Sequence, residues 1–84
     1  MTSTPGNVLR ELIEYIAREL VDDSDKVSVN IVESESIVVL ELSVGPDDVG
    51  KVIGKGGQTA KALRKVLSAA ATKHHKKSVL DIKE

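Results

Sequence analysis

The 84-residue sequence contains no cysteine, no phenylalanine and no tryptophan, and Tyr15 is its one aromatic residue. Without cysteine, the chain can form no disulfide framework, no thiolate nucleophile and no Cys-ligated zinc or iron–sulfur site. Without several aromatic rings, it cannot build the base-stacking platform of an RRM or an aromatic cage for a cationic ligand. These absences exclude several classes of site, and we expect a cytoplasmic localisation.

Long apolar runs are also missing from the sequence. The run from Ile37 to Leu40 is much too short for a transmembrane helix or the core of a signal peptide, so we expect no membrane contact. The length fits one small domain and leaves no room for a cleft between domains. We expect residues 1–6 to be a flexible tail and residues 7–84 to be the single domain.

Charge is strongly segregated along the chain, although the formal net charge is only −1. Residues 1–48 carry 3 basic and 11 acidic side chains, whereas residues 49–84 carry 9 basic and 2 acidic ones. The two parts therefore have net charges of −8 and +7. This segregation favours a basic face that binds a polyanion, while a solvated lysine-rich helix is the alternative interpretation.

Hydrophobic periodicity predicts three helices and three strands. Apolar residues recur at three- and four-residue steps in the helical segments, and they alternate with polar residues in the strands. At the start of the chain, either Thr4 before Pro5 or Asn7 is the helix N-cap. The predicted elements are a helix over 8–21, strands over 26–33 and 37–44, a short helix over 46–53, a helix over 58–73 and a strand over 78–83.

The order α-β-β-α-α-β constrains the sheet. The first two strands should form an antiparallel hairpin, and the second should be central because it is the more apolar. Two helices connect the second strand to the third, so these two strands should be parallel and joined by a right-handed crossover. The residues predicted to point inward from the central strand are Val38, Leu40, Leu42 and Val44.

The most specific local feature is the loop Gly54-Lys55-Gly56-Gly57 between the last two helices. Glycines allow another backbone to approach closely, and Lys55 adds a positive charge. The helix that begins near Gln58 directs its free N–H groups into the same space. These features favour a phosphodiester over the loop, whereas a sharp turn that needs positive φ angles is the alternative.

Catalytic motifs are not supported. The string from Gly45 to Val52 has P-loop spacing up to its lysine, but Val52 stands where Ser or Thr must bind magnesium. His74 and His75 are adjacent and therefore face different directions on a helix, without carboxylates at metal-ligand spacing. We expect no enzymatic activity, no cofactor, no metal and no small-molecule substrate.

The segment Val52-Ile53-Gly54-Lys55-Gly56-Gly57-Gln58-Thr59 resembles the I-G-x-x-G signature of the KH domain. Together with the element order, residues 8–82 resemble the KhpA family of small bacterial single-KH RNA-binding proteins. The resemblance implies an α+β, type II KH fold: a three-stranded mixed sheet with the helices packed on one face.

The resemblance also implies binding of single-stranded RNA, with a GxxG loop clamping about four nucleotides of backbone. In this sequence, Gly54 and Gly57 would frame the loop, while Lys55 and Gly56 would contact phosphates. Val52 and Ile53 would form an apolar floor for bases, and Lys65 is one more basic residue of the last helix. The candidate RNA-binding residues are Lys51, Val52, Ile53, Gly54, Lys55, Gly56, Gly57, Gln58, Lys61 and Arg64.

One short clamp without aromatic stacking predicts weak, salt-sensitive RNA binding, so useful affinity requires avidity. The resemblance implies a homodimer, or a heterodimer with a larger Jag-like KH protein. Ile37 and Val39, on the outer face of the central strand, are candidates for that contact. The expected role is a post-transcriptional regulator or RNA chaperone. The alternative is an adaptor that pairs with a second KH-type protein and binds RNA weakly or not at all.

Overall fold

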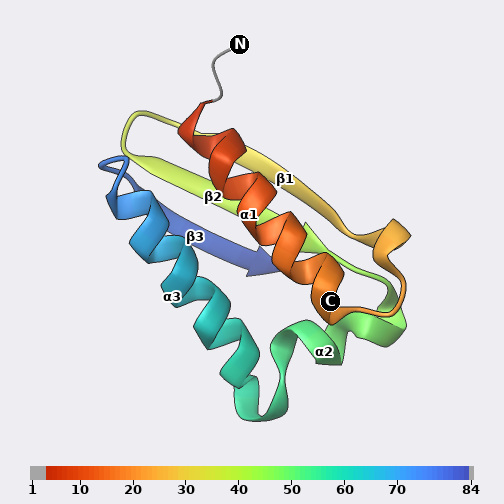
Figure 1. The fold of residues 1–84 in the computed structure, drawn as a ribbon. Coiled ribbons are helices and arrows are strands. Elements are labelled where there is room, and N and C mark those ends of the chain that lie inside the picture. The colour runs from red at the N-terminus through yellow and green to blue at the C-terminus, as the bar shows by residue number, and fades with distance from the viewer. Residues whose placement is uncertain (1–3, 84) are drawn as a thin grey trace.

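The computed structural model describes residues 4–83, and its elements follow the predicted order (Figure 1). The first predicted strand is two residues shorter than expected, because Ser24–Lys26 forms a 3₁₀ turn before it. The predicted short helix is divided into a 3₁₀ turn, Pro46–Asp48, and a helix, α2. The helices and strands are α1 (Pro5–Leu20), β1 (Ser28–Glu33), β2 (Ile37–Ser43), α2 (Val49–Ile53), α3 (Gln58–Thr72) and β3 (Lys77–Ile82).

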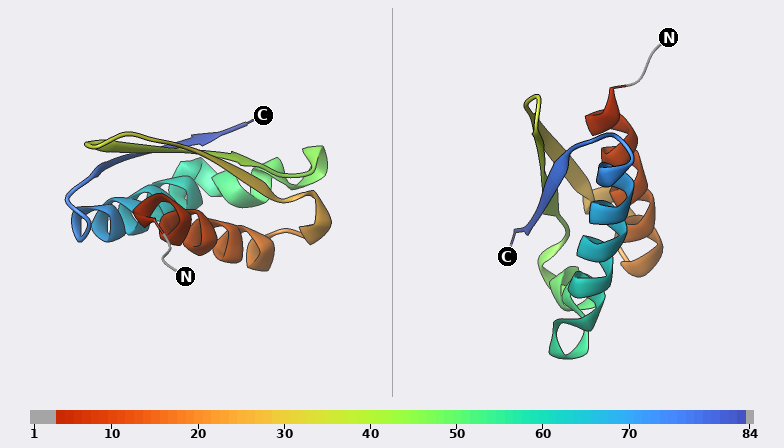
Figure 2. Two further views of the ribbon diagram at one scale, coloured as in Figure 1. Left: turned by 90° about the horizontal axis from the view of Figure 1, so that it is seen from above. Right: turned by 90° about the vertical axis from the view of Figure 1, so that its left-hand side faces the viewer.

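The three strands form one mixed sheet in the order β1-β2-β3. Strands β1 and β2 are antiparallel, and β2 and β3 are parallel, which confirms both predicted pairings. The helices gather on one side of this sheet (Figure 2), so the described residues leave its other face uncovered. No helix among residues 4–83 has the length and apolar character needed to cross a bilayer.

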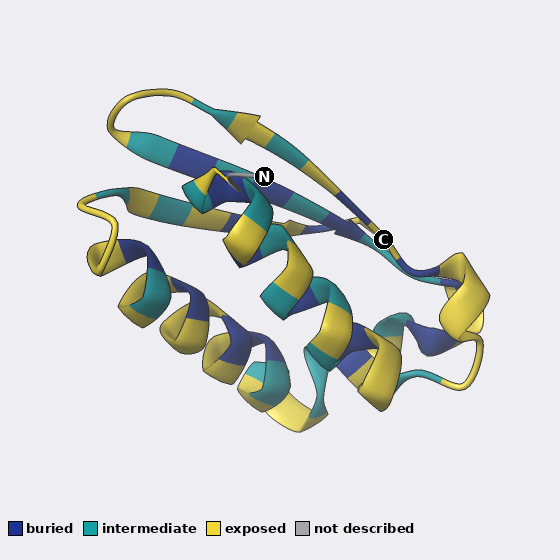
Figure 3. Ribbon diagram, turned by 45° about the horizontal axis from the view of Figure 1, so that its top comes forward, coloured by how far each residue is buried: buried dark blue, intermediate teal, exposed yellow. Residues whose placement is uncertain are grey.

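The core lies between the sheet and the helices. Val38, Leu40 and Leu42 of β2 are completely buried, as predicted, whereas Val44 is only partly buried. Buried positions run along β2 and along the sides of α1 and α3 that face the sheet (Figure 3). Full burial of each large aliphatic side chain contributes roughly 2 kcal/mol. The central strand therefore fixes the position of both long helices.

The first helix begins earlier than the predicted tail boundary allows. Thr4 is the N-cap, and its Oγ1 accepts a hydrogen bond from the Asn7 N–H at 3.2 Å. Pro5 and Gly6, which were assigned to the tail, form the first turn of α1. Proline suits this position because its φ is already helical and its missing N–H would have no helical partner. The rest of the predicted tail, residues 1–3, lies outside the described residues.

An ion pair at one end of the sheet joins the α3–β3 connection to the end of β1. Lys76 Nζ lies 2.9 Å from Glu33 Oε2, and the same ammonium donates to the carbonyl of Ser34. The Glu33 carboxylate also lies against Gly6 of α1, whose backbone N–H helps to lower the pKa of Glu33. The hydrogen bond from Lys76 is the main cause that lowers the pKa of Glu33. Lys76 therefore stabilises the fold and is not a free cation.

The end of α3 has an unusual residue in its terminating turn. His75 has a φ of +59°, the only positive φ at a non-glycine residue in the described part of the chain. The Lys76 N–H donates to the Ala71 carbonyl and the His75 N–H to the Thr72 carbonyl, at 3.1 and 3.0 Å. This is the Schellman pattern, in which glycine usually occupies the left-handed position.

Replacing His75 by glycine should stabilise the protein, because glycine adopts the left-handed conformation without the steric cost of a Cβ. We expect His75→Gly to raise the free energy of unfolding by roughly 0.5–1 kcal/mol, measured by urea denaturation. His74→Gly is the matched control, since His74 has no positive φ, and it should not stabilise. Equal effects of the two substitutions would contradict this explanation.

Acidification should remove the stabilisation that Glu33 provides. Its pKa in the folded protein lies below the ordinary value of 4.5, so its contribution is complete above that pH and is lost as the pH falls. We expect wild type to be more stable than Glu33→Gln at neutral pH, and this difference to disappear in strong acid. Urea denaturation across the pH range measures it, and a pH-independent difference would contradict the prediction.

Candidate nucleic-acid interface

The glycine-rich loop projects from one end of the molecule, where α2 meets α3 (Figure 1). Lys55 and Gly56 at its tip are exposed, and so is Gln58, the first residue of α3. The loop is held by two backbone hydrogen bonds, from the Gly54 N–H to the Gly50 carbonyl at 2.8 Å and from the Gly57 N–H to the Gly54 carbonyl at 3.1 Å. The tip is therefore accessible while its base is fixed.

Glycine is needed at position 54 for a different structural reason than at position 56. Gly54 has a φ of +78°, and a Cβ there would lie 2.7 Å from the Thr59 Cβ and 2.8 Å from the Thr59 backbone nitrogen. The sharp-turn interpretation is therefore correct for Gly54. Gly56 also has a positive φ, but a Cβ there would have no neighbour within 4 Å. Its outer side is open to an approaching ligand.

The start of α3 lies directly beside the open side of the loop. Gly57, in the left-handed conformation, is its N-cap, and none of the described side chains caps the helix. The first turn contains no acidic residue that would repel an anion. The free N–H groups and the positive end of the helix dipole are therefore left for an anion or for water.

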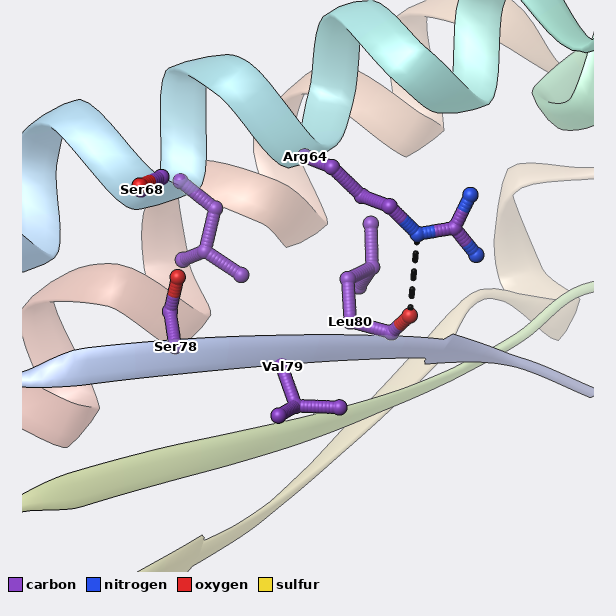
Figure 4. Close-up of a pocket in the computed structure, with 6 residues that line it drawn as sticks. Arg64, Ser68, Ser78, Val79 and Leu80 are labelled. Atoms are coloured by element: carbon purple, nitrogen blue, oxygen red, sulfur yellow. Dashed lines mark hydrogen bonds between the residues drawn. The ribbon is translucent and has the colours of Figure 1, made fainter.

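A groove runs between α3 and β3 (Figure 4). Its volume is about 360 Å³, with aliphatic side chains at its floor and two serine hydroxyls along it. The Arg64 Nε donates to the Leu80 carbonyl at 3.3 Å, which places this arginine across the groove. The lining residues are Arg64, Leu67, Ser68, Ser78, Val79 and Leu80.

Sequence reasoning found Arg64 but missed the β3 side of this groove. Ser78 and Leu80 read as ordinary strand residues, and they are far from the loop in the sequence. The available signal was the predicted crossover, which puts β3 at a sheet edge beside α3. The edge position also explains the exposed backbone groups. The Lys77 N–H donates to the Ser36 carbonyl just before β2, and the Lys83 N–H donates to the Leu42 carbonyl of β2. The backbone groups of the even-numbered residues between them therefore point away from β2.

Two predicted site residues, Val52 and Lys51, have other surroundings than expected. Val52 is completely buried, so it offers no surface to a base and instead anchors α2 in the core. Ile53 is partly buried beside the loop. Lys51 Nζ lies 3.1 Å from both an Asp48 and an Asp22 carboxylate oxygen, so it is a paired cation. Periodicity could not reveal this pairing, because Asp22 lies in a different connection.

Asp48 is the centre of that polar cluster. Only 3% of this residue is exposed. Its carboxylate accepts hydrogen bonds from the backbone N–H groups of Asp22 at 3.3 Å and Asp23 at 3.0 Å, and from Lys51. The Asp23 N–H is the main cause that lowers the pKa of Asp48, and the hydrogen bond to Asp48 is the main cause that raises the pKa of Lys51.

The unpaired positive charge lies on the loop, on α3 and just after it. Lys51, Lys76 and Lys83 are each held by carboxylates. Within residues 4–83, the lysines of the second half that form no ion pair are Lys55, Lys61, Lys65, Lys73 and Lys77. Of these, Lys55 lies on the loop and Lys61 and Lys65 on the first half of α3, whereas Lys73 and Lys77 lie at the opposite end of that helix.

Comparison with known proteins gives a consistent result. The family model described as "KhpA/KhpB, KH domain" matches residues 10–82. The RNA-binding protein KhpA of Clostridium perfringens is 53% identical over 74 residues, which cover 88% of this chain and 99% of that protein. The same-named protein of Aquifex aeolicus is 49% identical over 78 residues, covering 93% and 99%. In Borreliella burgdorferi the figures are 46% over 77 residues, covering 92% and 93%.

No solved structure matched the chain. The family assignment therefore rests on the sequence matches and on the element order. The mixed sheet, the helices on one face and the glycine loop between α2 and α3 agree with it. The chain belongs to the KhpA/KhpB family and is a type II KH domain.

Proposed function

We propose that this chain binds single-stranded RNA, with the loop 54–57 holding the backbone and the groove between α3 and β3 holding bases. The observation that carries this proposal is the loop itself. Its glycines leave an open surface at Gly56, beside the unpaired Lys55 and the uncapped start of α3. The name of the related proteins, RNA-binding protein KhpA, supports RNA as the ligand.

The loop would hold about four nucleotides of backbone, as GxxG loops do. Phosphate oxygens would approach over Gly56 and accept hydrogen bonds from the N–H groups at the start of α3. Lys55 and Lys61 would supply charge without giving up another partner, since neither forms an ion pair with a described residue. Lys51 is not required in this contact, because its ammonium is already bound by Asp48 and Asp22.

The groove would accept bases beside Arg64 and the two serine hydroxyls, over a floor of Leu67 and Leu80 that exposes little apolar surface. The backbone N–H of Leu80 points toward the open edge of β3 and would donate to the edge of a base. Arg64 already donates to the Leu80 carbonyl and would add positive charge over the groove. Because aromatic stacking is absent, we propose weak binding with modest sequence preference.

This mode of binding suits a post-transcriptional regulator or RNA chaperone that acts in the cytoplasm. Contacts to the backbone tolerate many sequences, and weak contacts allow rapid exchange between RNAs. We propose a binding module and no catalytic role.

A second candidate function, pairing with another KH domain, is favoured by the outer face of the sheet. Val32, Val39 and Val79 lie in register across the three strands, and Val32 is 62% exposed. The next outward-facing row contains Ile37 and Lys77, and the row on the other side contains Glu41 and Asp81. These valines with Ile37 form what we call the valine stripe.

The valine stripe is self-complementary. Two copies packed face to face, with strands antiparallel and centred on Val39, would place Lys77 of each near the acidic row of the other. The occupant would be a second copy or a larger Jag-like KH protein, and either would supply the avidity that one weak clamp lacks. An adaptor without RNA binding remains the competing function.

Reversing the charge of the loop should abolish RNA binding. Lys55→Asp combined with Gly56→Asp should weaken RNA binding by more than about tenfold, because it removes a phosphate partner and adds two repelling carboxylates. Both positions are exposed, and aspartate tolerates the positive φ of Gly56 better than most residues do, so the circular dichroism spectrum should stay close to that of wild type. A filter-binding or fluorescence-anisotropy titration with an unstructured RNA measures the affinity.

The matched control is Arg18→Asp combined with Ser36→Asp, which changes the net charge equally at two exposed positions, one on α1 and one in the β1–β2 turn. This control should bind RNA nearly as wild type does. Retained binding by the folded loop variant would instead favour the adaptor function or another RNA-binding surface. In Lys55→Ala, the slope of log affinity against log salt should decrease by about 0.7, the value for one phosphate of a single strand.

Self-association should depend on the valine stripe. Val39→Asp should shift sedimentation velocity profiles toward monomer, because it places a charge at the centre of the apolar contact. Ser43→Asp is the control, since Ser43 lies on the same strand and face but outside the stripe. A wild-type protein that stays monomeric at every concentration, alone and with the partner, would rule out this role of the stripe.

A further inference from the structure

Asp48 is the one buried charged residue in the described part of the chain. It occupies the N-cap position of α2, where an aspartate usually accepts hydrogen bonds from its own helix. Here the side chain makes no such bond. The carboxylate instead turns to the backbone of the connection between α1 and β1. Capping of α2 therefore does not explain this aspartate.

The hydrogen bonds of Asp48 join two parts of the chain that are 25 and 26 residues apart. They connect the start of the α1–β1 connection to the start of α2. Helix α2 has only five residues and leads directly into Gly54. Such a short helix has little stability of its own and takes its position from what it contacts. Its attachments are the buried Val52 and, at its first turn, Asp48.

We propose that Asp48 is a positioning residue for the glycine loop: it holds α2 in the orientation that presents loop 54–57 to an RNA backbone. Lys51 completes this arrangement, because its ammonium bridges Asp48 and Asp22 and offsets their negative charge. The expected effect on RNA affinity rests on the proposed RNA-binding function. The expected effect on the loop does not, because it can be measured without RNA.

The decisive comparison is between Asp48→Asn and Asp47→Asn. Both remove one negative charge at neighbouring positions, but Asp47 is exposed and Asp48 is buried. If only charge mattered, both variants would bind RNA slightly more tightly. An asparagine at 48 has only one acceptor oxygen for the two backbone N–H donors. Its NH₂ group would face one of these donors, so that one hydrogen bond is lost. We therefore expect Asp48→Asn to bind an unstructured RNA about tenfold more weakly, and Asp47→Asn to bind as wild type or better.

Hydrogen–deuterium exchange gives the readout that does not need RNA. In Asp48→Asn, the amides of Gly54 and Gly57 should exchange faster, while those of the β1–β2 hairpin should exchange as in wild type. Asp47→Asn should change neither. If Asp48→Asn does not fold, Lys51→Met serves in its place. It keeps the backbone hydrogen bonds of Asp48 and should raise exchange at Gly54 and Gly57 to a smaller extent.

The outcomes separate the two proposals. A folded Asp48→Asn with wild-type exchange at the loop and RNA affinity equal to that of Asp47→Asn would overturn the positioning role. Unchanged loop exchange in Lys51→Met would overturn it equally if Asp48→Asn is unfolded. If the loop exchanges faster in Asp48→Asn but the wild-type protein binds no RNA, the positioning role is supported and the RNA-binding function is rejected.

Discussion

The chain reverses direction between α2 and α3 in a space that has no room for a side chain. A Cβ at Gly54 would overlap Thr59, and the backbone there takes a positive φ that other residues rarely adopt. This constraint turns α3 back along the sheet. It also leaves Lys55 and Gly56 at an exposed tip and the first N–H groups of α3 without capping side chains. The candidate phosphate site is a direct consequence of this turn.

The lysines of the second half have two different roles. Lys51 is bound by the neighbouring Asp48 and by Asp22 of the α1–β1 connection, and it holds α2 in place. Lys76 is bound by Glu33 at the end of β1, and it holds the end of α3 in place. The lysines on the loop and α3 form no ion pair within the described residues, so their charge is available to a polyanion. A net charge near zero is therefore compatible with a strongly basic surface, since the acidic side chains lie on other elements.

The domain presents two separate surfaces because its sheet is covered on one face only. The groove lies between α3 and the edge strand β3, on the helical side. The valine stripe lies on the open face. Val79 belongs to the strand segment that lines the groove, but its side chain points away from α3 (Figure 4). A partner on the open face would leave the loop and the groove accessible, so pairing and RNA binding are compatible. For a small domain with Tyr15 as its one aromatic residue, this compatibility matters because a single clamp contributes few contacts.

The sequence by itself determined the element order, the mixed sheet and the position of the glycine loop. These features depend on local periodicity, on glycine and proline, and on the handedness of the crossover, all of which act through neighbouring residues or general chain geometry. The residues that point inward from β2 were predicted for the same reason. The interpretation of Gly54 as a turn residue was correct, because its constraint comes from Thr59, five residues away.

Only the tertiary structure decided which basic and apolar residues are free to act. Val52 and Lys51 both fit the motif, but Val52 is buried in the core and Lys51 is paired with Asp22 and Asp48. The β3 side of the groove and the buried Asp48 also had no local signal. Burial and ion pairing depend on segments that meet only when the chain is folded, and no periodicity within one segment records which distant backbone groups its side chains will contact.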